Sequence, residues 1–271
     1  MKQIYKILTA VSVFAAAVSC DKDSAETGSL KVGILGDSIS TYEGYIDNSY
    51  KSYYPRVEEG VKADVDNWTE TYWGILLNEY WHAELDVNAS YSGTCITPRD
   101  GFNTDFLTRA TTFKNPDVII VNGGTNDYLK GKKADGVVTP EKFRVAFENL
   151  LTALQKKYPH AQLIVVVGDF VKGDYGDIAV ETAKKFRAPC VDFRPDTKSI
   201  GKVFGDKTNP HPDAAGMAFM AKGIHDRTKS VIDNLKKTHM TPGPGGLYCQ
   251  HVWFARNLPL NGKFLSYANI L

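Results

Sequence analysis

Residues 31–40 read KVGILGDSIS, and the predicted fold is built outward from them. The apolar run at 32–35 predicts a short buried strand, and the Gly-Asp-Ser that follows predicts a tight turn. Open α/β sheets present reactive side chains at the carboxyl ends of their strands. Ser38 is therefore the candidate nucleophile. Its hydroxyl needs a base to take the proton and donors for the charge that develops on the substrate oxygen.

Three later blocks can supply these groups. They are NASYSG at 88–93, GGTND at 123–127 and NPHPDAAGM at 209–217. The intervals between blocks each fit one βα unit, and four blocks in register are far more specific than one Gly-Asp-Ser. Together they resemble the SGNH (GDSL-type) hydrolase family of esterases and lipases. The resemblance spans roughly residues 30–237.

The resemblance assigns roles to four of these residues. It implies that His211 is the general base for Ser38, and that the backbone N–H groups of Ser38 and Gly93 form an oxyanion hole with the Asn126 amide. The alternatives are a helix-capping histidine, a plain turn glycine and a plain Gly-Thr-Asn-Asp turn. Asp127 is expected to brace its loop by accepting backbone hydrogen bonds.

The triad acid is the point where the sequence departs from the family pattern. An aspartate usually stands three residues before the histidine, and here that position is Thr208. Asp206 can reach the histidine if the intervening Asn-Pro bulges, and it is our candidate. There are two alternatives. One is a Ser-His dyad in which a backbone carbonyl orients the histidine ring, and the other is a carboxylate from elsewhere in the chain. Asp213 is expected to favour the following helix N-terminus electrostatically.

Alternating strands and helices predict an α/β fold: a doubly wound, flavodoxin-like, parallel five-stranded sheet with helices on both faces. The run at 118–121 is the most apolar and predicts a central strand buried on both faces. The other strands are expected at 32–35, 85–89, 163–167 and 189–193. The helices are expected at 70–80, 105–113, 140–158, 178–186 and 213–235, with a polar loop at 130–138.

A long insertion rich in aromatic residues follows the nucleophile, at residues 41–69. Long loops after the strands of a sheet build substrate pockets, and sugars stack on flat aromatic faces. Tyr42, Tyr45 and Trp68 are therefore candidate substrate-binding residues. The alternative is that these rings only cover the edge of the sheet.

The two ends of the chain predict export and an appended tail. Residues 1–19 have a basic start, an apolar run and small residues, which is the layout of a signal peptide. The Ser-Cys at its end resembles a bacterial lipobox, so Cys20 is the expected lipidation site. Residues 20–29 are then expected to form a tether between the membrane and the domain. The alternative is an ordinary cleaved signal peptide with an incidental cysteine. The catalytic domain is expected at 30–238, followed by a Gly/Pro linker and an unassigned tail at 239–271.

Composition restricts the partners. The net charge is +1, which gives no reason to expect nucleic acid, and no Cys/His cluster has zinc-ligand spacing, so no metal or other cofactor is expected. Association with a membrane is expected only through the lipid anchor. The expected location is the bacterial cell envelope, most simply the outer membrane. In this respect the chain resembles lipoprotein esterases of Bacteroidetes.

The sequence therefore predicts a serine esterase that removes short acyl groups, O-acetyl above all, from small esters or polysaccharide. A polar, aromatic-rich mouth suits these substrates better than long acyl chains, which need an extended apolar groove. A lipase or thioesterase is the enzymatic alternative. The alternative from another class is a surface glycan-binding protein without turnover.

Overall fold

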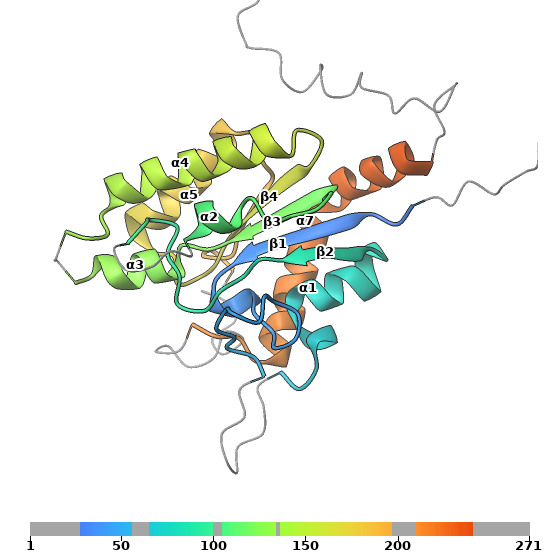
Figure 1. The fold of residues 1–271 in the computed structure, drawn as a ribbon, viewed down its shortest axis with the longest axis horizontal. Helices are drawn as coiled ribbons and strands as arrows, with labels where there is room; N and C mark the ends of the chain where they lie inside the picture. Colours follow the sequence, from blue (N-terminus) through green and yellow to red (C-terminus); the bar gives the residue numbers. More distant parts are fainter. Residues whose placement is uncertain (1–27, 56–64, 100–104, 134–135, 197–209, 241–271) are drawn as a thin grey trace, which may run out of the picture.

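The computed structural model describes residues 28–55, 65–99, 105–133, 136–196 and 210–240. Its centre is a sheet of five parallel strands in the order β2-β1-β3-β4-β5 (Figure 1). This is the doubly wound, flavodoxin-like order that the sequence predicts. The strands are β1 (Lys31–Gly36), β2 (Glu84–Asn88), β3 (Val118–Asn122), β4 (Gln162–Val167) and β5 (Cys190–Asp192).

The central strand β3 sets the edge at which the site is built. All its residues are buried, as expected for an apolar run covered on both faces. Gly36 at the end of β1 pairs with Asn122 at the end of β3, and the Asp37 N–H donates to the Asn122 carbonyl at 3.3 Å. The segments that follow β1 and β3 therefore leave the sheet side by side.

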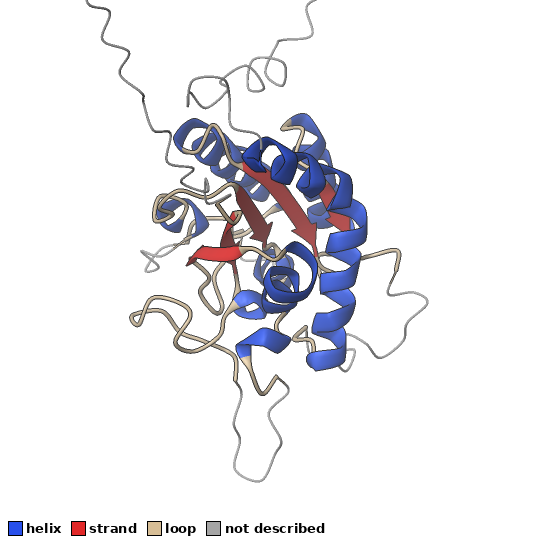
Figure 2. Ribbon diagram, turned by 90° about the vertical axis from the view of Figure 1, so that its right-hand side faces the viewer, coloured by secondary structure: helices blue, strands red, loops and turns tan. Residues whose placement is uncertain are grey.

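Helices cover both faces of the sheet, as Figure 2 shows. α1, η3 and α7 pack on one face with Tyr72, Trp73, Met217 and Ile224 in the core, and α2, α4 and α5 pack on the other with Phe106, Phe147 and Ile178. The helical segments are η1 (Ser38–Ser40), η2 (Trp68–Glu70), α1 (Tyr72–Ile75), η3 (Leu76–Trp81), α2 (Phe106–Arg109), α3 (Thr125–Gly131), α4 (Pro140–Lys157), α5 (Gly173–Lys185) and α7 (Ala214–Met240).

α4 illustrates why these segments are helical. The Thr139 side chain caps its first turn by accepting from the Lys142 N–H at 3.3 Å, and Pro140 occupies the first turn, where no N–H is needed. Its apolar residues recur at helical spacing and are buried against the sheet: Phe143, Phe147, Leu150, Leu151 and Leu154. The helix predicted at 140–158 is confirmed.

Several predicted helices and loops differ from the structure. A turn and a loop were expected where α3 forms, because Gly, Thr, Asn and Asp are poor helix formers. The helix starts where Gly124, at φ 100°, reverses the chain after β3, and tertiary packing of Tyr128 on Tyr175 stabilises it. The helix expected at 70–80 is a short α-helix followed by the π-helical η3, and the one at 178–186 starts earlier, at Gly173. The helix expected at 105–113 is shorter and ends at Arg109, whereas the one expected at 213–235 continues to Met240.

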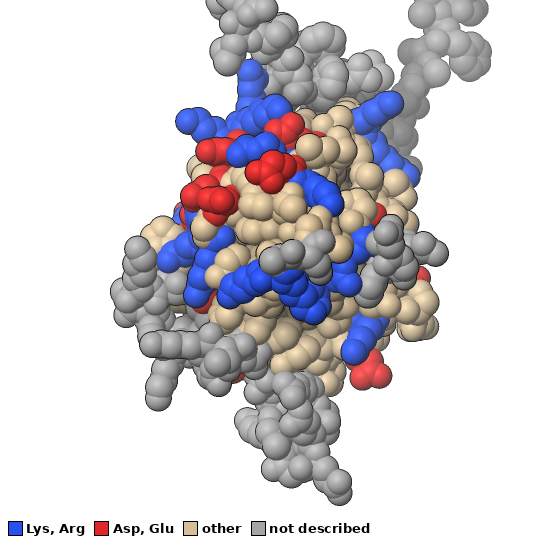
Figure 3. Space-filling model, turned by 90° about the vertical axis from the view of Figure 1, so that its left-hand side faces the viewer, with Lys and Arg blue, Asp and Glu red and all other residues tan. Residues whose placement is uncertain are grey.

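The surface over α4 and α5 carries charges of both signs (Figure 3). Arg144 of α4 pairs with Glu181 of α5 at 2.9 Å, and Lys185 of α5 pairs with Glu148 of α4 at 2.7 Å. Exposed pairs of this kind contribute about 0–1 kcal/mol each. Among the described residues, no helix combines the length and apolar character needed to cross a bilayer.

Several predicted features lie outside the described residues. They are the signal peptide at 1–19, Cys20, most of the tether at 20–29, the tail from 241 onward, Asp206 and Thr208.

Candidate active site

Ser38 and His211 meet at the carboxyl edge of the sheet. Ser38 opens η1 directly after β1, and Asp37 caps this turn by accepting from the Ile39 N–H at 3.1 Å. His211 lies just before α7, and its Nε2 is 2.8 Å from the Ser38 Oγ. A neutral imidazole at that distance can accept the hydroxyl proton. The structure thus brings together the two residues that the sequence predicts as nucleophile and base, 173 positions apart.

Gly93 lies in the loop that follows β2. Its φ is +79°, which a glycine adopts without strain. Apart from its two chain neighbours, no atom of the described residues lies within 4 Å of the place where a Cβ would stand. The preceding Ser92 N–H donates to the Lys51 carbonyl at 2.9 Å. The aromatic-rich insertion after the nucleophile and the Gly93 loop therefore support each other.

Asn126 and Asp127 tie the first turn of α3 to the same loop. The Asn126 Nδ2 donates to the Thr94 carbonyl at 3.0 Å. The amide carries two hydrogens, so this bond leaves one N–H for a further acceptor. The Asp127 carboxylate accepts from the Ile96 and Thr97 N–H groups at 2.8 Å each. It therefore accepts backbone hydrogen bonds as predicted, but these bonds brace the loop after β2 and not the loop of Asp127 itself.

Arg109 is a buried part of this arrangement that the sequence analysis missed. It ends α2, its side chain is fully buried, and it donates to the carbonyls of Gly36 at 3.0 Å and of Ala89. A third bond reaches the Thr94 hydroxyl at 2.8 Å. Burial lowers the pKa of the guanidinium to about 10. One side chain thus joins the ends of β1 and β2 to the Gly93 loop. A lone arginine in a polar segment gives no sequence signal for such a role.

Two buried carboxyl groups lie beneath the site. Burial raises the pKa of Asp37 to about 7, and it also raises the pKa of Asp127. The Oδ2 of Asp37 has no hydrogen-bond partner among the described residues. Because a buried unpaired carboxylate is costly, Asp37 holds a proton more readily than an ordinary aspartate.

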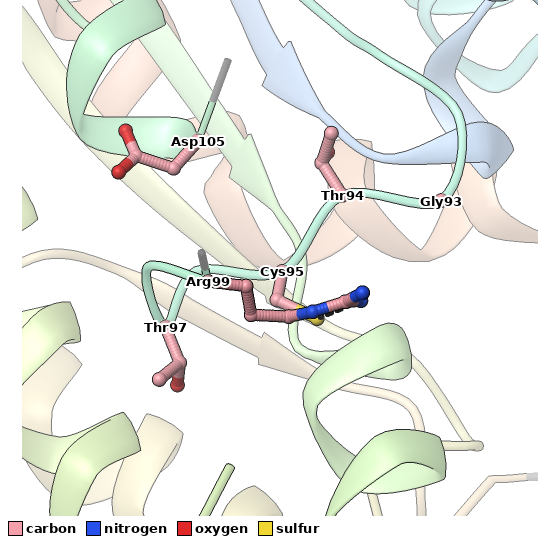
Figure 4. Close-up of a pocket in the computed structure, with 6 residues that line it drawn as sticks. All are labelled: Gly93, Thr94, Cys95, Thr97, Arg99 and Asp105. Carbon is pink, nitrogen blue, oxygen red and sulfur yellow. Dashed lines mark hydrogen bonds between the residues drawn. The ribbon is translucent and has the colours of Figure 1, made fainter. Parts of the chain in front are cut away.

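A small hollow of about 10 Å³ adjoins the Gly93 loop (Figure 4). Cys95 lies in it with its sulfur 3.9 Å from Arg99, and burial raises the pKa of this thiol to about 12. The thiol is therefore protonated and unreactive at neutral pH. The hollow is lined by Gly93, Thr94, Cys95, Thr97, Arg99 and Asp105.

The three aromatic residues predicted to bind substrate occupy different surroundings. Tyr45 is 36% exposed and borders an open cavity of about 440 Å³ between the insertion and β2. Trp68 stacks behind Tyr45 at 4.8 Å. Tyr42 is buried, and its hydroxyl donates to the Asp66 carbonyl at 2.9 Å. Tyr50, which the sequence analysis did not select, also borders the cavity and stacks on Tyr91 at 5.0 Å.

No group of three or more His, Cys, Asp or Glu side chains within the described ranges is arranged to hold a metal ion. Cys95 and Cys190 are both free thiols.

A parallel α/β sheet with a serine at the end of its first strand, facing a histidine, defines the class of the protein: a serine ester hydrolase. The model of the GDSL-like lipase/acylhydrolase family matches residues 30–228, and the chain belongs to that family.

Solved structures agree with this assignment. A GDSL-like lipase from Bacteroides uniformis is 27% identical, with a TM-score of 0.62, and the match covers 75% of this chain and 97% of that one. A GDSL-like lipase from Bacteroides ovatus is 26% identical, also with a TM-score of 0.62, and the match covers 75% of this chain and 99% of that one. A carbohydrate esterase shares the fold, with 14% identity and a TM-score of 0.53. That match covers 74% of this chain and 69% of the esterase. A search of curated proteins found no match.

Proposed function

We propose that the protein is a serine esterase for short acyl esters, O-acetyl groups on carbohydrate above all, with Ser38 as nucleophile and His211 as general base. The observation that carries the proposal is the 2.8 Å contact between the Ser38 Oγ and the His211 Nε2. A serine hydroxyl becomes a useful nucleophile at neutral pH when a base within hydrogen-bond distance takes its proton.

The reaction has two halves. The Ser38 proton passes to His211 while Oγ attacks the acyl carbon, and the carbonyl electron pair moves onto the oxygen. The tetrahedral intermediate collapses as the bond to the alcohol breaks and His211 returns the proton to the departing oxygen. Water then attacks the acyl-enzyme by the same route and releases the acid.

The developing oxyanion would be held by the N–H groups of Ser38 and Gly93 and by the Asn126 amide. The bond from Asn126 to the Thr94 carbonyl supports this role, because it fixes the amide beside the Gly93 loop while one N–H is left for the oxyanion. Loss of one such donor costs about 3 kcal/mol of transition-state stabilisation.

The preference for a short acyl group and a sugar rests on the hollow and the cavity that lie near the Gly93 loop and the aromatic insertion. The hollow beside Gly93 has a volume of only about 10 Å³, room for about one water molecule, so it offers no extended groove for a long acyl chain. The neighbouring cavity presents Tyr45 and Tyr50 together with Asp47 and Asn88, a combination of flat rings and polar groups that suits a sugar. Hydrolysis of lipids or thioesters and glycan binding without turnover are the competing functions.

Three parts of the proposal concern residues outside the described ranges. Asp206 is proposed to orient His211, which the activity of an Asp206→Asn variant tests. Cys20 is proposed as a lipidated first residue after a signal peptide. The enzyme would then work in the cell envelope, held to the membrane by its lipid.

The test is hydrolysis of 4-nitrophenyl acetate, butyrate and octanoate by the protein and by Ser38→Ala, His211→Ala and Asn126→Ala. We expect turnover confined to the short esters, loss of turnover in the first two variants, and a kcat lowered about 100-fold with little change in KM for the third. Preference for octanoate favours a lipase. Turnover that survives Ser38→Ala contradicts the mechanism, and release of acetate from acetylated xylan or pectin tests the sugar.

A further inference from the structure

The His211 imidazole lies against two consecutive tyrosines of the insertion that follows Ser38. The Tyr53 ring is stacked on it, with centroids 3.5 Å apart and planes 7° from parallel. Tyr54 meets the same ring edge-on, with centroids 6.4 Å apart, and its hydroxyl donates to the Pro212 carbonyl at 2.7 Å. The base is therefore covered on one face and held at its neighbouring residue by a segment outside the four family blocks.

Tyr53 is itself fixed relative to the nucleophile. Its N–H donates to the Thr41 hydroxyl oxygen at 2.8 Å, and that hydroxyl donates to the Ser38 carbonyl, also at 2.8 Å. Thr41 is fully buried. Two hydrogen bonds thus connect the backbone that carries Ser38 with the backbone that carries the ring over His211. Displacement of the backbone that carries that ring would require this buried connection to break.

We propose that Tyr53 is a positioning residue for the catalytic base. Its face holds the imidazole in the orientation in which Nε2 meets Ser38, and it stabilises the imidazolium that forms when Nε2 takes the proton. Aromatic faces carry negative potential, so they attract a cation placed over the ring. The proposal rests on the proposed function, since it needs His211 to act as the base.

The same stack has a competing interpretation, in which Tyr53 only shields His211 from water. The two interpretations predict opposite shifts of the base's apparent pKa when the ring is removed. Loss of a stabilised imidazolium lowers it, whereas restored contact with water raises it. The titratable and hydroxyl groups that face the imidazole from the described elements include Ser38 of η1 and Tyr53 and Tyr54 of the insertion.

The experiment compares Tyr53→Phe, which keeps an aromatic face, with Tyr53→Leu, which keeps an apolar side chain without one. The readout is the pH dependence of kcat/KM and of kcat for 4-nitrophenyl acetate. We expect Tyr53→Phe to stay within about twofold of the parent protein. For Tyr53→Leu we expect kcat to fall about tenfold with KM little changed, and the apparent pKa of the base to fall by up to about one unit.

The chain offers a matched control in Tyr80, which stacks on His225 of α7 at 4.4 Å and 15°. Tyr80→Leu removes an equivalent tyrosine–histidine stack outside the Ser38 site and should leave kcat and its pH profile unchanged. Equal kinetics for the Phe and Leu variants of Tyr53, an upward pKa shift, or a loss confined to KM would overturn the proposal while the Ser38 and His211 variants still support the esterase. Absence of ester hydrolysis by the parent protein would overturn both.

Discussion

At the scale of single residues, neighbours in the nucleophile turn have different surroundings. Asp37 is 1% exposed with one oxygen unpartnered among the described residues, whereas Ser38 next to it meets His211. The Asp37 Oδ1 is needed to cap η1, because it accepts from the Ile39 N–H. The turn that presents the nucleophile is thus built on a carboxyl group that burial keeps protonated up to about pH 7.

This burial makes stability depend on pH. Between the ordinary aspartate value of 3.8 and about 7, the folded protein holds the Asp37 proton while the unfolded chain has lost it. The unfolding free energy therefore falls as pH rises through this range. Asp37→Asn keeps the capping oxygen but removes the titration, so the slope should flatten by up to one proton, about 1.4 kcal/mol per pH unit. Urea unfolding between about pH 4 and pH 8 measures it, and an unchanged slope would contradict the burial argument.

At the scale of elements, the loop after β2 is held in place from two directions. Asp127 of α3 accepts two of its backbone N–H groups, and Arg109 of α2 donates to its Thr94 hydroxyl. Arg109 also donates to the backbone carbonyls at the ends of β1 and β2. The position of Gly93 relative to Ser38 is therefore supported by two fully buried side chains from the helices α2 and α3.

Arg109→Met should lower both stability and turnover. It leaves the Gly36 and Ala89 carbonyls without this donor in a buried site, which we expect to cost about 3 kcal/mol of unfolding free energy. We expect kcat to fall at least about tenfold, because a small displacement of Gly93 would weaken the bond that we propose its N–H donates to the oxyanion in the transition state. Denaturant unfolding and ester hydrolysis measure the two effects.

Two further variants separate the effect of Arg109 on the loop from its effect on stability. Thr94→Val removes the arginine's bond to the loop, together with the bond that the Thr94 hydroxyl donates to the Tyr91 carbonyl, and leaves the two carbonyl bonds of Arg109 in place. It should lower kcat with a smaller loss of stability than Arg109→Met. Arg144→Met, in the exposed pair with Glu181, should change unfolding by about 0–1 kcal/mol and leave kcat alone. Full activity in Thr94→Val would show that Arg109 supports the fold without setting the loop.

At the scale of the whole molecule, the sheet divides the core into two clusters, one under each layer of helices (Figure 2). Phe147 of α4 is 2% exposed in one of them, while Val145 on the same helix is 60% exposed. We expect Phe147→Ala to lower the unfolding free energy by about 3–5 kcal/mol and Val145→Ala to lower it by well under about 1 kcal/mol. Denaturant titration measures both. Similar losses in the two variants would contradict the assignment of Phe147 to the core.

The sequence by itself determined the order of the sheet, all five of its strands to within one residue at each end, and the pairing of Ser38 with His211. These follow from local patterns: continuous apolar runs mark buried parallel strands, and the residues after them must gather at one edge. The selection of Gly93 and Asn126 rests instead on the resemblance to the family, and the structure joins Asn126 to the loop that contains Gly93. The α3 helix does not follow from local patterns, because its turn-forming residues are helical only in their tertiary context.

Only the tertiary structure decided the contacts that connect distant segments. Arg109 lies in no family block, yet it holds three of the segments that build the site. Tyr53 and Tyr42 come from the same aromatic insertion, but one ring stacks on His211 and the other is buried in the core. Composition and spacing treat such residues alike, since a loop without periodicity does not specify which way its side chains face. Packing against the rest of the chain makes that choice.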